Sequence, residues 1–160
     1  MGPNDGILIV HIDTNVKVES IETSAGTIAK DLAPGEHFSL YVVGEGTYRW
    51  NRINRKVQGF DVHWQLWPWR LKRSDKFTVK RGHLNYLGLL KLRRGEHDFH
   101  MYVRPYNQSA VMYRKIEQLH PDLLAKMPIR YAGPERDEFL ERYQQAKKAQ
   151  SEMTTAPERP

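Results

Sequence analysis

The feature that most constrains the fold is a change of hydrophobic period near Pro105. Before that residue, apolar and polar side chains alternate in short runs, and turn signals rich in Gly, Pro, Asn and Asp separate the runs. This alternation is typical of half-buried β-strands. After Pro105 the apolar residues recur at a period near 3.6, which is typical of helices. We therefore predict a mainly β chain with helices at its C-terminal end.

The expected strands follow one another at short spacing, with no helical pattern between them. They cover residues 7–12, 16–23, 27–32, 38–43, 47–51, 60–66, 77–80, 84–92 and 99–103. Such a series favours an antiparallel β-sandwich, although an up-and-down barrel remains open because the sequence does not show closure. The core predicted from the alternation comprises Leu40, Val42, Phe60, Val62, Trp64, Tyr86 and Phe99.

The patterns divide one domain into three parts. Residues 1–106 are expected to form the sandwich, residues 107–150 a helical extension packed on it, and residues 151–160 a flexible polar tail. Two helices are expected in the extension, with apolar stripes at Met112, Ile116 and Leu119 and at Phe139, Leu140 and Tyr143. No apolar run approaches the ~20 residues that cross a bilayer, so we expect no transmembrane segment.

Catalytic and metal-binding signatures have little support in this sequence. The chain has no cysteine, and no phosphate-binding glycine loop, nucleophile elbow or zinc-protease helix occurs in it. His11 with Asp13, and His97 with Asp98 and His100, are the nearest approach to metal or acid–base groupings. For His11 and Asp13 an ordinary strand end is the favoured interpretation, because two ligands make no closed site. On a strand His97 and His100 would face opposite ways, so joint coordination would need a turn there, and a role without metal is again favoured. We expect no catalytic residue, no metal and no cofactor, and hence no enzyme.

Positive charge is concentrated in the middle of the chain. Residues 1–48 hold two Lys or Arg and seven Asp or Glu, a balance of −5, whereas residues 49–94 hold thirteen and two, a balance of +11. All four Trp lie in that basic segment. Cations beside aromatic rings suit phosphate-bearing partners, although Trp50 and Trp64 also fit the core by strand alternation. The candidate ligand-binding residues are Arg49, Arg52, Arg55, Trp67, Trp69, Arg70, Lys72 and Arg73.

Three stretches carry a resemblance to a known family. They are Gly6-Ile7-Leu8-Ile9-Val10, the stretch from Leu32-Ala33-Pro34-Gly35 to Gly46-Thr47-Tyr48-Arg49-Trp50, and Phe77-Thr78-Val79-Lys80-Arg81-Gly82-His83-Leu84-Asn85-Tyr86-Leu87-Gly88. Together they resemble small exported proteins and lipoproteins of the Gram-negative envelope, which are prealbumin-like β-sandwiches of undetermined function. Gly82, Tyr86 and Gly88 suit a turn, a core position and a close backbone approach, so these motifs specify a fold and no chemistry.

The resemblance implies a periplasmic location, with a signal peptide or a lipidated N-terminus that the printed start does not contain. The function expected first is therefore a non-enzymatic envelope protein that binds another envelope protein or supports an assembly. The alternative is a binding module for an anionic polymer, such as lipopolysaccharide, a charged glycan or nucleic acid, or for a lipid head group, through the basic and Trp-rich face.

Overall fold

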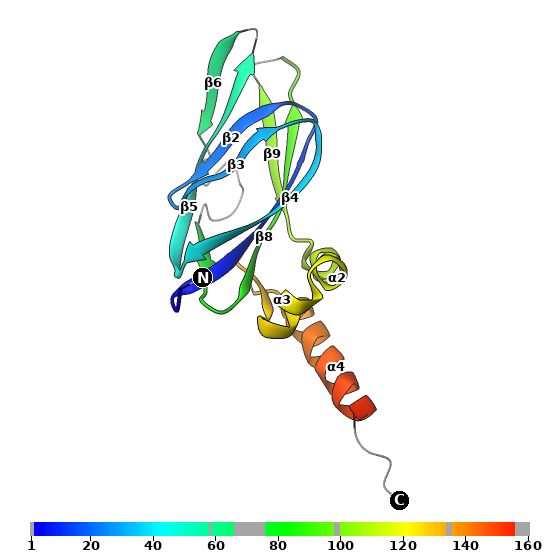
Figure 1. Cartoon of the computed structure of the whole chain (residues 1–160). Coiled ribbons are helices and arrows are strands. Elements are labelled where there is room, and N and C mark those ends of the chain that lie inside the picture. Colours follow the sequence, from blue (N-terminus) through cyan, green and yellow to red (C-terminus); the bar gives the residue numbers. More distant parts are fainter. Residues whose placement is uncertain (1, 58, 66–75, 98–99, 134–135, 156–160) are drawn as a thin grey trace, which may run out of the picture.

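A computed structural model describes residues 2–57, 59–65, 76–97, 100–133 and 136–155, without the side chains of residues 63–65 and 151–155. The strands are β1 Asp5–Thr14, β2 Val18–Thr23, β3 Gly26–Leu32, β4 Gly35–Gly44, β5 Gly46–Val57, β6 Phe60–Gln65, β7 Lys76–Val79, β8 Leu84–Arg94, β9 Met101–Tyr106 and β10 Ile129–Tyr131. The helices are α2 Ser109–Leu119, α3 Pro121–Lys126 and α4 Glu138–Thr155. The chain is thus mainly β with C-terminal helices, as predicted (Figure 1).

The strands form two sheets. Sheet A has the order β10-β8-β1-β4, with β9 also paired to β8, and sheet B has the order β3-β2-β5-β6, with β7 also paired to β5. Every pair in sheet B is antiparallel, but β8 runs parallel to both β1 and β10 in sheet A. The antiparallel prediction is therefore wrong for two pairs of sheet A. Parallel pairing joins strands that are far apart in sequence, and alternation does not show which strands meet.

Strand β1 explains how the layers stack, because both of its faces are covered. Every residue from Gly6 to Ile12 is buried. Leu8, Val10 and Ile12 join the buried cluster shared by sheets A and B, as in a β-sandwich. Ile7 and Ile9 join a second buried cluster, which lies between sheet A and the helices. The molecule therefore has three layers: sheet B, sheet A, and helices over part of the outer face of sheet A.

The C-terminal region contains one strand as well as helices. The last expected strand ends at Tyr106, the predicted boundary, but β10 lies within the region 107–150 and pairs with the start of β8. Helix α4 continues to Thr155, past the start of the expected tail. Leu119 and Phe139 are 56% and 60% exposed, so their assignment to buried stripes is wrong. Among the described residues, no helix is both long enough and apolar enough to cross a membrane.

The predicted core is correct in part. Tyr86 is fully buried, and Leu40 and Val62 are half-buried against the two clusters. Val42 and Phe60 are 59% and 68% exposed, so both predictions are wrong. Val42 shares the outer face of sheet A with Leu40, but the helices cover only Leu40. Phe60 begins edge strand β6 opposite Val57, which lies past the last residue of β5 that pairs with β2. The side chain of Trp64 and all of Phe99 lie outside the described residues.

The Gly-x-x-Asn-Tyr-x-Gly stretch has the structural role expected of it. Gly82 turns the chain into β8 with a φ of 64°. Gly88 has a φ of 90°, and the pairing of β1 with β8 shifts at this point, so Leu87 and Gly88 together face the single residue Val10. This bulge lets Tyr86 face the helices while Leu90 faces sheet B.

Candidate functional site

The structure describes only part of the predicted basic site. Trp67, Trp69, Arg70, Lys72 and Arg73 lie outside the described residues. Arg49, Arg52 and Arg55 lie on β5, which forms the middle of sheet B between β2 on one side and β6 and β7 on the other.

The three arginines of β5 do not share one face. Arg49 is exposed and its neighbour Trp50 packs against the buried cluster, so Arg49 lies on the outer side of sheet B. Arg55 pairs with Val62, whose side chain packs against that same cluster. Because residues opposite each other in a ladder lie on one face, half-buried Arg55 lies on the inner side of sheet B. A single arginine surface along β5 is therefore not formed.

Cross-strand ion pairs account for much of the charge segregation seen in the sequence. Acidic β2 and basic β5 are neighbours, and Arg52 Nε lies 2.7 Å from Glu22 Oε2. Further cations of the basic segment pair with acids of the first 48 residues, in most cases across neighbouring strands. The ion pairs are Arg52–Glu22, Lys56–Glu19, Arg81–Glu45, Lys91–Asp13 and Arg93–Asp13.

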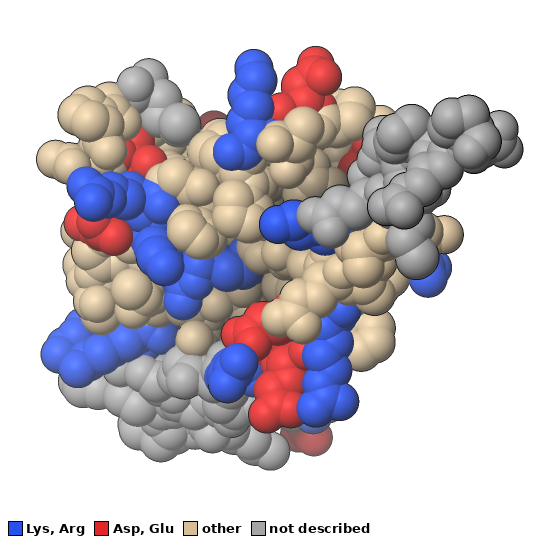
Figure 2. All heavy atoms as spheres, turned by 90° about the horizontal axis from the view of Figure 1, so that it is seen from below, with Lys and Arg blue, Asp and Glu red and all other residues tan. Residues whose placement is uncertain are grey.

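These pairs lower the positive potential that the basic segment can offer to an anion. Figure 2 shows the same mixing at the end of the molecule it displays, where acidic side chains lie beside basic ones in several places. Within the described residues, Arg49 is the member of the predicted site that is exposed and forms no ion pair.

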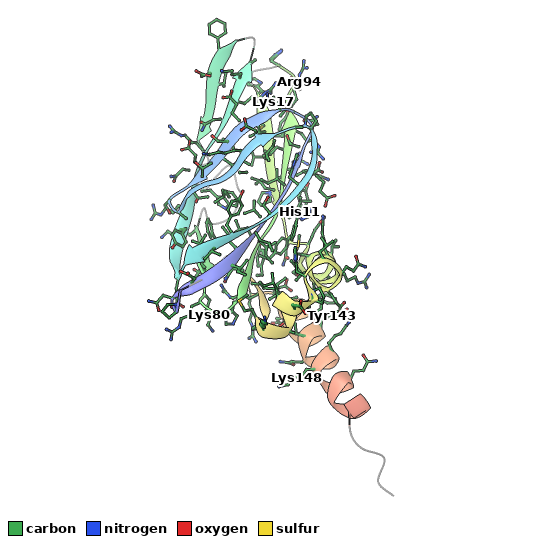
Figure 3. All side chains as sticks on the ribbon, in the orientation of Figure 1. His11, Lys17, Lys80, Arg94, Tyr143 and Lys148 are labelled. Atoms are coloured by element: carbon green, nitrogen blue, oxygen red, sulfur yellow. The ribbon has the colours of Figure 1, made fainter. Side chains whose placement is uncertain are left out.

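His11 is a buried histidine of β1 that lies near the helices. Its Nε2 lies 2.8 Å from Glu36 Oε1 and its Nδ1 lies 3.3 Å from the hydroxyl of Tyr86. Lys115 of α2 donates to the same Glu36 oxygen at 3.0 Å. Burial lowers the pKa of His11, so the ring is neutral at pH 7, with Nε2–H donated to the carboxylate. Figure 3 shows His11 on sheet A beside α2.

This network ties β1, β4, β8 and α2 together. Tyr86 is fully buried, and burial raises the pKa of its hydroxyl far above the ordinary value, so it holds its proton. Hydrogen bonds from Lys115 and His11 lower the pKa of Glu36. The carboxylate of Glu36 is thus committed to two partners, which suits a structural link between the edge of sheet A and α2.

The other groupings considered from the sequence do not form closed sites. Asp13 pairs with Lys91 and Arg93 instead of joining His11 around a shared ligand. The His97 and His100 rings lie 5.5 Å apart across a turn, and Asp98 lies outside the described residues. Within the described part of the chain, no three His, Asp or Glu side chains gather as metal ligands would.

An open groove of about 970 Å³ lies between α2, α3 and α4, with an apolar side that includes Leu124 and Met127. Its charges are largely paired, because Lys147 Nζ lies 2.6 Å from Glu117 Oε1 and Glu141 binds Arg136. The hydrogen bond to Glu117 raises the pKa of Lys147, which keeps this ammonium charged. The groove therefore presents neither a pocket of one charge nor a reactive group.

Edge strand β4 is the feature with the clearest capacity to bind something. Its residues pair with β1 in one uninterrupted register from Asp5↔Gly44 to Thr14↔Gly35. Its other side has no strand partner among the residues that the structure describes. Ten residues of strand expose a row of backbone N–H and C=O groups about 33 Å long.

Two other strands at sheet edges, β3 and β9, carry features that hinder pairing with a further strand, and most of β4 does not. Strand β3 contains Lys30 and Asp31, the latter with a φ of 51°, and its pairing with β2 is irregular. Strand β9 contains Arg104 and Pro105. Natural sheets use charges, prolines, bulges and short strands to block edge-to-edge contact. From Phe38 to Val43, β4 has no charge, proline or bulge, a signal that was readable in the sequence and was missed.

Comparison with protein-family models, with curated proteins and with solved structures finds no match to this chain.

Proposed function

We propose that the protein is a non-enzymatic interaction module that joins to another protein chain by strand addition at β4. The observation that carries this proposal is the unprotected edge of sheet A, which is long, regular and uncharged over Phe38–Val43. In strand addition the backbone groups supply the affinity, and the side chains that flank the edge supply the specificity. A rigid edge suits this role, and β4 is held by β1 along its length and by Glu36 to α2.

The setting we propose is the envelope of a Gram-negative bacterium, with a periplasmic location, a prealbumin-like topology and support of an assembly as the role. This part rests on the family resemblance of the strand and turn motifs. Intact-mass measurement of the native protein after cell fractionation tests it. A chain recovered from the cytosol with Met1 as its true start would contradict the proposed location.

The alternative function, binding of an anionic polymer or a lipid head group, has less support. Arg52 is paired with Glu22 and Arg55 lies on the inner face of sheet B. That alternative now depends on Arg49 and on the residues from Trp67 to Arg73. Retention on heparin, DNA or lipopolysaccharide columns at low salt, lost steeply as salt rises, would favour it over strand addition.

Site-specific photo-crosslinking in the native host tests the strand-addition proposal. A photoreactive phenylalanine analogue replaces Val42 on β4 in one variant and Tyr102 on β9 in the matched control, since both side chains are exposed, at 59% and 50%. We expect a covalent adduct at position 42 and little or none at position 102, with hydrogen exchange slowed across Phe38–Val43 in the complex. Equal labelling at both positions, or no adduct at position 42, would refute the proposal.

A further inference from the structure

We infer that the strand added to β4 is β4 of a second copy of this chain, related to the first by a twofold axis near Leu40. This inference rests on the proposed function, since it names the partner at the same edge. A strand that is open along one side is self-complementary when it can run antiparallel to its own copy, and twofold dimers are the commonest closed assembly.

The outer face of β4 is only partly covered within one copy. Phe38, Leu40 and Val42 lie on this face at alternate positions. Phe38 and Leu40 pack against the cluster under the helices, and Lys115 of α2 lies 5.2 Å from the centre of the Phe38 ring. Val42 lies outside this cluster and is 59% exposed. Each copy therefore leaves one apolar side chain of its edge strand open to solvent.

Helix α2 has a matching open surface beside the same edge. Its Lys115 contacts both Phe38 and Glu36, so the side of α2 that bears Lys115 faces β4. Val111 and Leu119 lie four residues before and after Lys115 and hence on the same side of the helix. They are 57% and 56% exposed. We call Val111, Lys115 and Leu119 the edge stripe of α2.

A twofold axis near Leu40 brings these two open surfaces together. Antiparallel pairing of Leu40 with its own copy places Val42 opposite Phe38 of the second chain, and therefore next to the edge stripe of that chain's α2. Residues opposite each other in a ladder pack on one face, so Val42 of each copy is covered by Phe38 and the edge stripe of the other copy. A shift of the register by one residue would place Val42 opposite a residue of the second chain that points to the other face of the sheet, so this match is lost.

Charge does not oppose the contact. Although the chain carries a formal net charge of +6, the acidic residue of β4, Glu36, is bound by Lys115 and His11. No charged side chain follows it in the strand. Pairing at this edge would join two five-stranded copies of sheet A into one continuous sheet, with both sets of helices on the same face.

Sedimentation of the full-length chain over a concentration series tests the inference. The wild type should be a dimer. Val42→Lys should weaken association at least tenfold, because a charge on an edge blocks strand pairing. Tyr102→Lys, which places the same charge on the already protected edge β9, should behave as the wild type. At concentrations low enough for the wild type to be monomeric, both variants should keep its melting temperature, because both side chains are largely exposed in the single chain.

A disulfide reports the position of the axis, because the chain has no cysteine of its own. Leu40→Cys should form a covalent dimer under mild oxidation, because position 40 lies opposite position 40 of the second chain in the proposed dimer. Tyr102→Cys should not, because β9 lies away from that contact. A wild type that stays monomeric at every concentration, with no Leu40→Cys dimer, would overturn this inference. Crosslinking of position 42 to a chain of different mass would then leave the proposed function standing, whereas no adduct at all would remove both.

Discussion

Replacing Gly88 with Ala should destabilise the protein more than any other single methyl addition at a glycine in β8 or in the turn before it. Gly88 has a φ of 90°, a conformation that L-residues rarely adopt. A Cβ there would lie 2.8 Å from the carbonyl oxygen of Tyr106 and 3.5 Å from Cε2 of Tyr131. The first atom belongs to the backbone, so it cannot move aside without disturbing the pairing of β8 with β9.

The size of the effect follows from two contributions. Positive φ costs a non-glycine residue about 1–2 kcal/mol, and overpacking against fixed atoms costs about 1–3 kcal/mol. We expect Gly88→Ala to lower the free energy of unfolding by about 3 kcal/mol, or the melting temperature by roughly 6–12 °C. Gly82→Ala is the matched control, because its φ of 64° brings the first contribution and nothing lies within 4 Å of its Cβ. It should cost about 1 kcal/mol.

Urea denaturation of the wild type and both variants, followed by tryptophan fluorescence and circular dichroism, measures these differences. A Gly88→Ala protein as stable as Gly82→Ala would show that the bulge can relax around a methyl group. A glycine would then not be needed at position 88 to turn Tyr86 toward the helices and Leu90 toward sheet B.

Three further predictions test other parts of the structure. Asn85→Ala should lower the free energy of unfolding by about 3 kcal/mol, because the buried amide donates to the carbonyls of Lys80 and His83 at 3.0 and 2.9 Å and accepts from the Lys80 amide at 2.9 Å. The control Asn54→Ala, at a half-buried position of sheet B, should lower it by less than about 1 kcal/mol. Similar urea midpoints for the two variants would contradict this. Stability should fall as pH drops through 6.5, the ordinary pKa of His, because burial lowers the pKa of folded His11 and the unfolded chain binds the proton more readily. The lowered pKa of Glu36 adds a second loss below its ordinary value of 4.5. His11→Gln should abolish the upper step in a series of urea midpoints, and an unchanged upper step would assign it to another group. The fragment 1–106 should be insoluble or bind hydrophobic dyes, because it exposes Ile9, Leu84 and Tyr86, which the helices and β10 cover; a folded, monomeric fragment would show that the sandwich is independent.

Alternation predicted strands such as β7 well because they have one face that is more buried than the other. It could not tell which layer covers each face. Phe38, Leu40 and Val42 do share a face, but that face is the outer one, and the helices cover only part of it. The residues of β4 that reach the shared core are Tyr41 and Val43, which alternate with the predicted core residues Leu40 and Val42.

The basic segment shows why a charge count along the chain was not enough to define a site. Glu22 and Arg52 are far apart in sequence and adjacent in sheet B. A basic strand beside an acidic strand forms ion pairs across the sheet, so a segment of one charge need not bind a ligand. The composition of a segment does not show which strand lies beside it. Strand β10 was missed for a different reason, since a run of only Ile129–Tyr131 is too short to show a period.

The position of β10 also has a consequence for the order in which the protein can be made. Strand β1 leaves the ribosome first, yet it is flanked by β4 and by β8, and β8 is itself flanked by β10. Sheet A thus stays incomplete until residue 131 has been synthesised. Until then its long apolar strands have no lasting cover, and contacts between such distant segments form slowly. We expect β1 to be open to non-native contacts until β8 and β10 have been synthesised.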